Sequence, residues 1–317
     1  MGRSAPDGGI RVSTVRFDSD GTTCVAQFFP AAGGTGDSAG APVVVLGHGF
    51  GGTVDSGLVP FAERLSAAGF AAFAFDYRYF GASEGLPRQR ISIREQIADF
   101  RAACTAAAAQ PGVDARRLVV WGVSLAGGHV FEVAATTPGV AAAVALTPLV
   151  SGPAAAVAAL PQHRPSTMLR STVTGWRSAL AQRAGRGPAT IPLVGRPGEL
   201  ATLTADGYYE AYLAMAGPTW RNEVDAGVGM QLGGYRPAAK HAKSIRCPML
   251  VQIADFDRGA PPQAAAKAAF AARAEVRHYP CDHFDVFAGG AWFDHVVDHQ
   301  IAFLVRHLGA PTASVTG

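Results

Sequence analysis

Charged side chains are scarce in this sequence. Asp, Glu, Lys and Arg together make up 16% of the 317 residues, and the formal net charge is only +3. The basic residues are scattered and form no run that could follow a phosphate backbone, so we expect no nucleic-acid partner. Hydrophobic residues make up 49% of the chain, which is enough for a sizeable core and argues against disorder away from the ends.

Cysteine is also rare, and no two cysteines form a CxxC pair among Cys24, Cys104, Cys247 and Cys281. We therefore expect reduced thiols and a cytoplasmic protein. The first nine residues contain no apolar run behind Arg3, so no secretory signal is predicted. Gly, Pro or charge interrupts every apolar stretch, and no membrane span is expected.

Short apolar runs of strand length recur along the chain, separated by amphipathic segments. Alternation at residues 10–18 and 23–29, joined by Ser19-Asp20-Gly21, predicts an antiparallel hairpin. Runs typical of strands buried on both faces follow at residues 43–46, 70–75, 118–121, 140–146 and 249–253, with a more polar strand at 275–279. Apolar spacing of three and four residues predicts helices at 60–68, 91–109, 125–136, 261–272 and 292–307. The fold class is therefore α/β, with a mostly parallel, doubly wound sheet after the N-terminal hairpin.

The alternation of strand and helix stops between residues 149 and 244. This stretch has helical pieces but no run typical of a buried strand, and a structureless loop of that length would be unusual. We expect a helical cap at 149–244, inserted into one α/β domain made of residues 1–148 and 245–317. Six large side chains of the cap either line a pocket or form the cap's own core: Trp176, Tyr208, Tyr209, Tyr212, Met215 and Trp220.

A serine stands where a buried strand runs directly into a helix, in Trp121-Gly122-Val123-Ser124-Leu125-Ala126-Gly127-Gly128. This context is typical of a nucleophile elbow, whose sharp turn requires small residues two positions before and two after the serine. Gly122 and Ala126 meet that requirement, although the usual pattern has Gly where Ala126 stands. Without partners for Ser124, the segment would be only a glycine-rich turn with a surface serine.

We expect the base and the acid that would assist Ser124 to lie at the ends of later strands, because ligands bind open α/β folds at the carboxyl ends of their strands. Among the histidines, only His283 follows the final strand, in Cys281-Asp282-His283-Phe284-Asp285. Both Asp255 and Asp257 follow the preceding strand, and we prefer Asp257 because it lies farther from the strand and four residues before Pro261. Asp257 would hold the imidazole tautomer and stabilise the imidazolium.

Two backbone N–H groups are needed for an oxyanion hole. The Gly-rich segment Gly47-His48-Gly49-Phe50-Gly51 follows the first buried strand and can supply the N–H of Phe50, and Leu125 supplies the other. We expect His48 to order this loop rather than act as a base.

No cofactor and no metal are expected. The Gly-rich loop has neither a Rossmann fingerprint nor a P-loop lysine. His295 and His299 lie four residues apart, but Val296 stands where a zincin has its Glu.

Taken together, these motifs resemble the α/β-hydrolase superfamily, particularly its bacterial serine-aminopeptidase-like and carboxylesterase-like members. The segments around His48, Asp76, Ser124 and His283 fall in the family order, and the nucleophile, acid and base follow the family order Ser, Asp, His. The resemblance covers nearly the whole chain outside the cap and implies a serine hydrolase without a cofactor.

The expected reaction is cleavage of an ester or thioester with a hydrophobic acyl or aromatic group, through an acyl-enzyme on Ser124. Acyl transfer or cyclisation, peptide cleavage, C–C cleavage and a non-catalytic binding module of the same fold stay open, because fold alone does not fix function. The expected partner is a small-molecule substrate. A homo-oligomer is compatible with the sequence.

Overall fold

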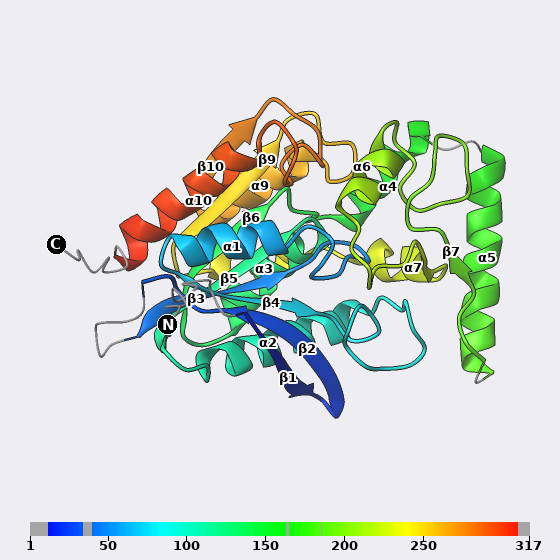
Figure 1. Ribbon diagram of the computed structural model, residues 1–317. Helices are drawn as coiled ribbons and strands as arrows, with labels where there is room; N and C mark the ends of the chain where they lie inside the picture. Colours follow the sequence, from blue (N-terminus) through cyan, green and yellow to red (C-terminus); the bar gives the residue numbers. More distant parts are fainter. Residues whose placement is uncertain (1–11, 34–39, 163–164, 185, 310–317) are drawn as a thin grey trace, which may run out of the picture.

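The computed structural model describes residues 12–33, 40–162, 165–184 and 186–309. Within them, one mixed sheet of eight strands has the order β1-β2-β4-β3-β5-β6-β9-β10 (Figure 1). The strands are β1 (Ser13–Ser19), β2 (Thr22–Phe29), β3 (Ala41–Gly47), β4 (Ala71–Asp76), β5 (Val113–Val123), β6 (Val140–Leu146), β9 (Met249–Ala254) and β10 (Glu275–Tyr279). β1 and β2 pair antiparallel with their neighbours, and every other pairing is parallel. The predicted α/β class and mostly parallel sheet are confirmed.

The N-terminal hairpin turns at Asp20 and Gly21, which have φ angles of 49° and 80°. Two consecutive positive φ angles are typical of a type I′ turn, whose twist matches that of the two strands. Residues 10 and 11 of the predicted first strand, and residues 34–39 between the hairpin and β3, lie outside the described residues.

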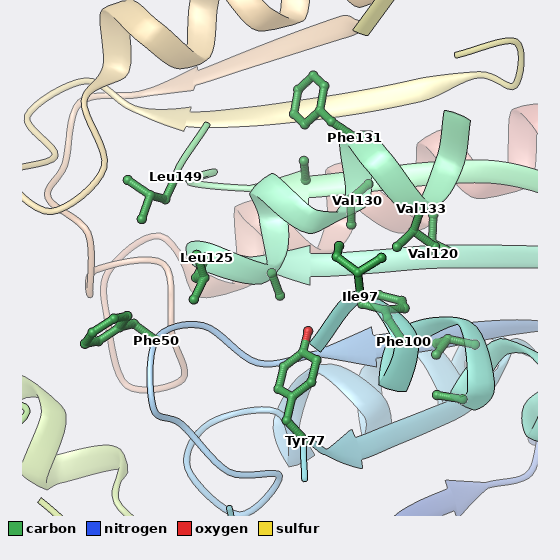
Figure 2. Close-up of a cluster of buried hydrophobic side chains, with 14 of the residues drawn as sticks. Phe50, Tyr77, Ile97, Phe100, Val120, Leu125, Val130, Phe131, Val133 and Leu149 are labelled. Carbon is green, nitrogen blue, oxygen red and sulfur yellow. The ribbon is translucent and has the colours of Figure 1, made fainter. Parts of the chain in front are cut away.

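Helices cover both faces of the sheet. α1 (Val59–Ala67) and α10 (Phe293–Leu308) pack on one face, and α2 (Ile93–Ala108), α3 (Leu125–Thr136) and α9 (Pro262–Ala272) pack on the other. Figure 2 shows part of the second layer, where Ile97 and Phe100 of α2 meet Val120 of β5 and Val130 of α3. Strands buried on both faces explain the continuous apolar runs in the sequence.

Residues 149–244, called the insert below, connect β6 to β9 and lie at one end of the sheet (Figure 1). Its elements are α4 (Gly152–Ala159), η1 (Leu160–Gln162), α5 (Pro165–Arg183), β7 (Thr190–Ile191), α6 (Tyr208–Met215), β8 (Val224–Asp225), α7 (Val228–Gly233), α8 (Pro237–His241) and η2 (Ala242–Ser244). β7 and β8 form an antiparallel pair that the sequence did not predict, because two residues per strand are too few for a pattern. Across the described ranges, no helix is both long enough and apolar enough to cross a bilayer.

A buried ion pair joins the hairpin, β4 and α2. The guanidinium of Arg78 binds the Asp99 carboxylate at 2.6 Å and donates to Ser19 Oγ at 2.7 Å. Asp99 is fully buried and also accepts the backbone N–H of Arg78 at 3.0 Å. A buried carboxylate is tolerated only while such partners remain.

We predict that Arg78→Ala lowers the free energy of unfolding by about 3–5 kcal/mol, because it leaves the Asp99 charge buried and unpaired. The matched control is Arg64→Ala, whose ion pairs with Asp294 and Asp298 are exposed and should contribute about 1 kcal/mol or less. Urea unfolding measures both changes. Equal effects of the two substitutions would contradict the importance of the buried pair.

Candidate active site

Ser124 lies at a strained turn between β5 and α3. Its backbone has φ 57° and ψ −117°, a conformation that costs free energy for any residue other than Gly. The turn is held by hydrogen bonds from Ser124 N to Leu146 O at 2.9 Å and from Leu149 N to Ser124 O at 2.8 Å. The surrounding sheet therefore imposes the geometry that presents the hydroxyl.

Close backbone approach explains the small residues on each side of Ser124. A Cβ at Gly122 would clash with the backbone of Ala126, so strand and helix can meet only if residue 122 is Gly. A Cβ at Gly49 would lie 2.8 Å from Ser124 Cβ, which is too close. The loop after β3 can therefore pack directly against the serine because residue 49 is Gly. The nucleophile candidate and the Gly-rich loop are thus brought together by the sheet.

His283 and Asp257 form a buried pair. His283 Nδ1 donates to Asp257 Oδ2 at 2.7 Å, while the N–H groups of Gly259 and Ala260 donate to Asp257 Oδ1 at 2.7 and 2.6 Å. Asp255 points elsewhere: it binds His278 at 2.6 Å in an exposed pair. Of the two carboxylates that follow β9, the structure brings Asp257 to the histidine.

A second carboxylate, Asp282, lies beside the imidazole. Burial acts to lower the pKa of His283, but the Asp257 charge, the hydrogen bond with Asp257 and the Asp282 charge outweigh it, and the pKa lies above its ordinary value. Burial acts to raise the pKa of Asp282, but hydrogen bonds from His283 N, Tyr208 Oη and Arg258 hold it below the ordinary value. Asp282 is therefore a charged neighbour of the imidazole.

Ser124 and His283 line the same cavity, whose volume is about 20 Å³. Its other walls are mostly apolar and come from both the sheet edge and the insert: His48, Gly49, Phe50, Val123, Leu203, Tyr212, Met215, Phe284 and Phe287. A cavity of this size holds about one water molecule. An acyl group can enter only if the insert or its side chains move.

Phe50 and Leu125, the two residues expected to form an oxyanion hole, are both buried. Phe50 lines this cavity, and Leu125 directly follows Ser124. Leu125 is the first residue of α3, so its N–H has no partner within the helix. Insert tyrosines hold both residues: Tyr212 donates to Phe50 O at 3.4 Å, and Tyr235 donates to Leu125 O at 3.1 Å. The insert therefore contacts the backbone around the candidate oxyanion hole.

His48 orders the loop that contains Phe50. Its Nε2 bonds the carbonyl of Ser56, and its ring stacks on Phe287. Burial lowers its pKa to about 4, so the ring is neutral at physiological pH. His48 therefore lies within the loop after β3, and the histidine that binds Asp257 is His283.

The six insert residues singled out in the sequence have different positions. Tyr212 and Met215 line the cavity, and Trp220 stacks on Tyr212 with ring centroids 4.8 Å apart. Tyr208 donates to Asp282 at 2.8 Å, and Tyr209 lies under the guanidinium of Arg196. Trp176 is 61% exposed and does not line the cavity.

Sequence reasoning missed several residues of the site. Phe284 and Phe287 line the cavity, and their positions one and four residues after His283 could have indicated this. Asp282 precedes the histidine directly, but only the fold shows that it is charged and linked to Tyr208. Leu203 comes from an irregular part of the insert that carries no pattern.

The described ranges contain no cluster of three or more His, Cys, Asp or Glu side chains arranged to hold an ion. His299 instead shares a hydrogen bond of 2.9 Å with Tyr279 Oη.

Comparison with known proteins gives the class of the protein. The sequence profile described as serine aminopeptidase, S33, matches residues 38–285. The quorum-quenching protein AidA of Acinetobacter baumannii is 34% identical over 92% of this chain and 94% of its own length. The thiohydrolase apmlB of Arthrinium phaeospermum is 27% identical over 84% of this chain and 89% of its own. The crystal structure of the α/β-hydrolase GrgF from Penicillium superposes with a TM-score of 0.76 at 21% identity, covering 94% of this chain and 99% of GrgF.

The fold and these relatives define an α/β-hydrolase. The chain belongs to the serine aminopeptidase S33 family, and it is an enzyme of the hydrolase class.

We predict that Asp257→Asn lowers kcat by about 10³- to 10⁴-fold. The N–H groups of Gly259 and Ala260 would keep the Asn oxygen, so its NH₂ would face His283 Nδ1 and force the ring proton onto Nε2. Asp255→Asn is the matched control and should change kcat less than about twofold. Steady-state kinetics with one chromogenic ester measure kcat for both variants. A larger loss of kcat in Asp255→Asn than in Asp257→Asn would indicate that Asp255 is the acid.

We further predict that Asp282→Asn shifts the rising limb of the pH–rate profile to lower pH. The negative charge of Asp282 raises the pKa of His283, and a general base becomes active as pH rises through its pKa. Without that charge the imidazole loses its proton at lower pH. Profiles of kcat/KM for wild type and variant measure the shift, with Asp255→Asn as control. An unchanged or upward-shifted limb would contradict the electrostatic role of Asp282.

Proposed function

We propose that this enzyme is a serine hydrolase that cleaves an ester or thioester through an acyl-enzyme on Ser124, with His283 as base and Asp257 behind it. The observation that carries the proposal is the shared cavity: it joins a serine on a strained turn to an imidazole that is hydrogen-bonded to a buried carboxylate. A serine needs such a base, and the base needs a group that fixes its tautomer.

In the first half of the reaction, Ser124 Oγ attacks the carbonyl carbon while its proton passes to His283 Nε2. The carbonyl electron pair moves to the oxygen, which faces the N–H groups of Phe50 and Leu125. When the oxyanion collapses, the bond to the leaving group breaks, and the alkoxide or thiolate takes the proton from His283. The acyl group stays on Ser124.

In the second half, water restores the serine. His283 removes a proton from water, the resulting hydroxide attacks the acyl carbon, and the carboxylic acid leaves as Ser124 regains a proton. The room for about one water molecule between Ser124, His283 and the insert supports this hydrolytic step. The charge of Asp257 stabilises the imidazolium formed in each half.

The apolar walls support a hydrophobic acyl or aromatic substrate. Phe50, Tyr212, Met215, Phe284 and Phe287 surround the serine, and no Asp, Glu, Lys or Arg side chain lines the described cavity. A relative named as a thiohydrolase supports the thioester among these substrates. In this proposal, residues 149–244 act as a cap that closes over the acyl group.

Acyl transfer is a second candidate, because a relative named polyketide transferase grgF is 32% identical over 44% of this chain. Acyl transfer by this chain would form the same acyl-enzyme on Ser124, and an alcohol or amine acceptor would then attack it in place of water. Product analysis separates the two: hydrolysis yields the free acid, and transfer yields an acylated acceptor.

We predict that a fluorophosphonate probe labels the wild type and that Ser124→Ala abolishes both labelling and turnover, with a loss in kcat of about 10⁴-fold or more. Ser13→Ala, at an exposed serine of β1, is the control and should label fully. A substrate panel of p-nitrophenyl esters, acyl-thioesters and amino-acid anilides then ranks the leaving groups.

Turnover of esters or thioesters above anilides supports the proposal. A preference for anilides would make the enzyme a peptidase. A wild type that never labels and turns over nothing in the panel would favour a binding module of the same fold.

A further inference from the structure

The outer face of α5 is apolar and uncovered. Val173, Trp176 and Leu180 are 47%, 61% and 59% exposed, and their spacing of three and four residues places them on one side of the helix. The opposite side is buried: Gly175 packs against the backbone of Ala226, and Ser178 Oγ donates to Asp225 at 2.8 Å. Figure 1 shows α5 at the outer edge of the insert, with β7 and α7 on its inner side. The apolar stripe therefore points away from the protein.

The sequence segment that contains this stripe carries charge of one sign. From residue 133 to residue 198 the sequence contains no Asp or Glu and six arginines: Arg164, Arg170, Arg177, Arg183, Arg186 and Arg196. Arg170 and Arg177 are exposed, and helical spacing places them beside Val173 and Leu180. Within the described ranges, neither guanidinium forms an ion pair with a carboxylate. The face thus combines exposed apolar side chains with free positive charge.

This combination argues against a second copy as the covering partner. In a symmetric dimer the same patch meets itself, so the arginines of one copy would approach those of the other with no acidic group of the segment to compensate. Among the described helices, α5 included, none is both long enough and apolar enough to cross a bilayer. The remaining complementary surface is apolar and negatively charged.

We propose that α5 docks the protein on an anionic lipid surface, lying flat with Val173, Trp176 and Leu180 at the boundary of headgroups and acyl chains. Arg170 and Arg177 would bind lipid phosphates while their methylene stems contact the apolar region. Trp is the side chain that favours this boundary, because its ring is apolar and its N–H is polar. Such docking places the insert where substrates with apolar acyl groups accumulate, but lipid binding itself does not depend on the proposed hydrolysis.

Vesicle binding of the full-length protein tests the proposal. We expect co-sedimentation with vesicles of phosphatidylcholine and phosphatidylglycerol, about tenfold tighter than with phosphatidylcholine alone and weakened by salt. Trp176 is the reporter: its emission should shift to shorter wavelength, and bromine-labelled lipid should quench it. Trp176→Phe should remove that signal, because the other three indoles are held within the fold: Trp121 is buried in the sheet, Trp220 stacks on Tyr212 and Trp292 packs against Tyr279.

Two variants of α5 should weaken binding about tenfold each, Arg170→Gln/Arg177→Gln through charge and Val173→Ser/Leu180→Ser through apolar area. All four side chains are exposed, so the fold and its thermal midpoint should stay unchanged. The matched control is Phe270→Ser/Lys243→Gln, which removes an 87% exposed ring and a nearby charge from a different surface and should leave binding intact.

Three outcomes would overturn the proposal. These are no binding to anionic vesicles, binding that only the Phe270→Ser/Lys243→Gln control abolishes, and a lipid-free dimer that the α5 variants dissociate in analytical ultracentrifugation. The last would make α5 a protein interface instead. Because none of these measurements uses turnover, a failure here is separate from a failure of the proposed hydrolysis.

Discussion

The strained turn at Ser124 is the constraint on which the rest of the structure depends. A φ of 57° at a residue with a side chain is stable only where the chain on both sides is held, and here β5 and α3 hold it from within the sheet. Gly122 lets the strand approach the helix, and Gly49 lets the neighbouring loop approach the serine. Ser124 thereby lines a cavity whose other walls come from the loop after β3, the loop after β10 and the insert.

Three aspartates near His283 differ in role because their surroundings differ. Asp257 is buried and takes all its hydrogen bonds from His283 and two backbone N–H groups, so it can orient the ring. Asp282 is held charged by Tyr208 and Arg258 and links the insert to the histidine loop. Asp255 is exposed beside His278 and has no contact with the site. Position in the fold, not residue type, separates them.

The insert does more than cover the serine. Tyr212 and Tyr235 bind the carbonyls of Phe50 and Leu125, Tyr208 binds Asp282, and Asp55 accepts Thr219 N at 2.8 Å. The cavity, at about 20 Å³, is smaller than the acyl group of the proposed substrate, so the proposed reaction requires the insert to move when that substrate enters. Substrate binding and the geometry of the site are therefore coupled through the insert, whose outer face we assign to a lipid surface.

Local patterns were sufficient to predict the fold class and most element bounds. Buried strands need continuous apolar runs, and helices need an apolar face that repeats with the helical period. Both patterns lie within a single segment of the sequence, as in β6, α3 and β10. The strand-to-helix context of Ser124 and the place of His283 after β10 were readable for the same reason. Other features depended on contacts between distant segments, such as the hydrogen bond between Tyr212 and Phe50, which lie 162 residues apart. These features are the carboxylate that meets the imidazole, the place of Phe284 and Phe287 in the cavity wall, and the exposure of Trp176. Such contacts follow from packing and hydrogen bonding among distant elements, and no local pattern encodes them.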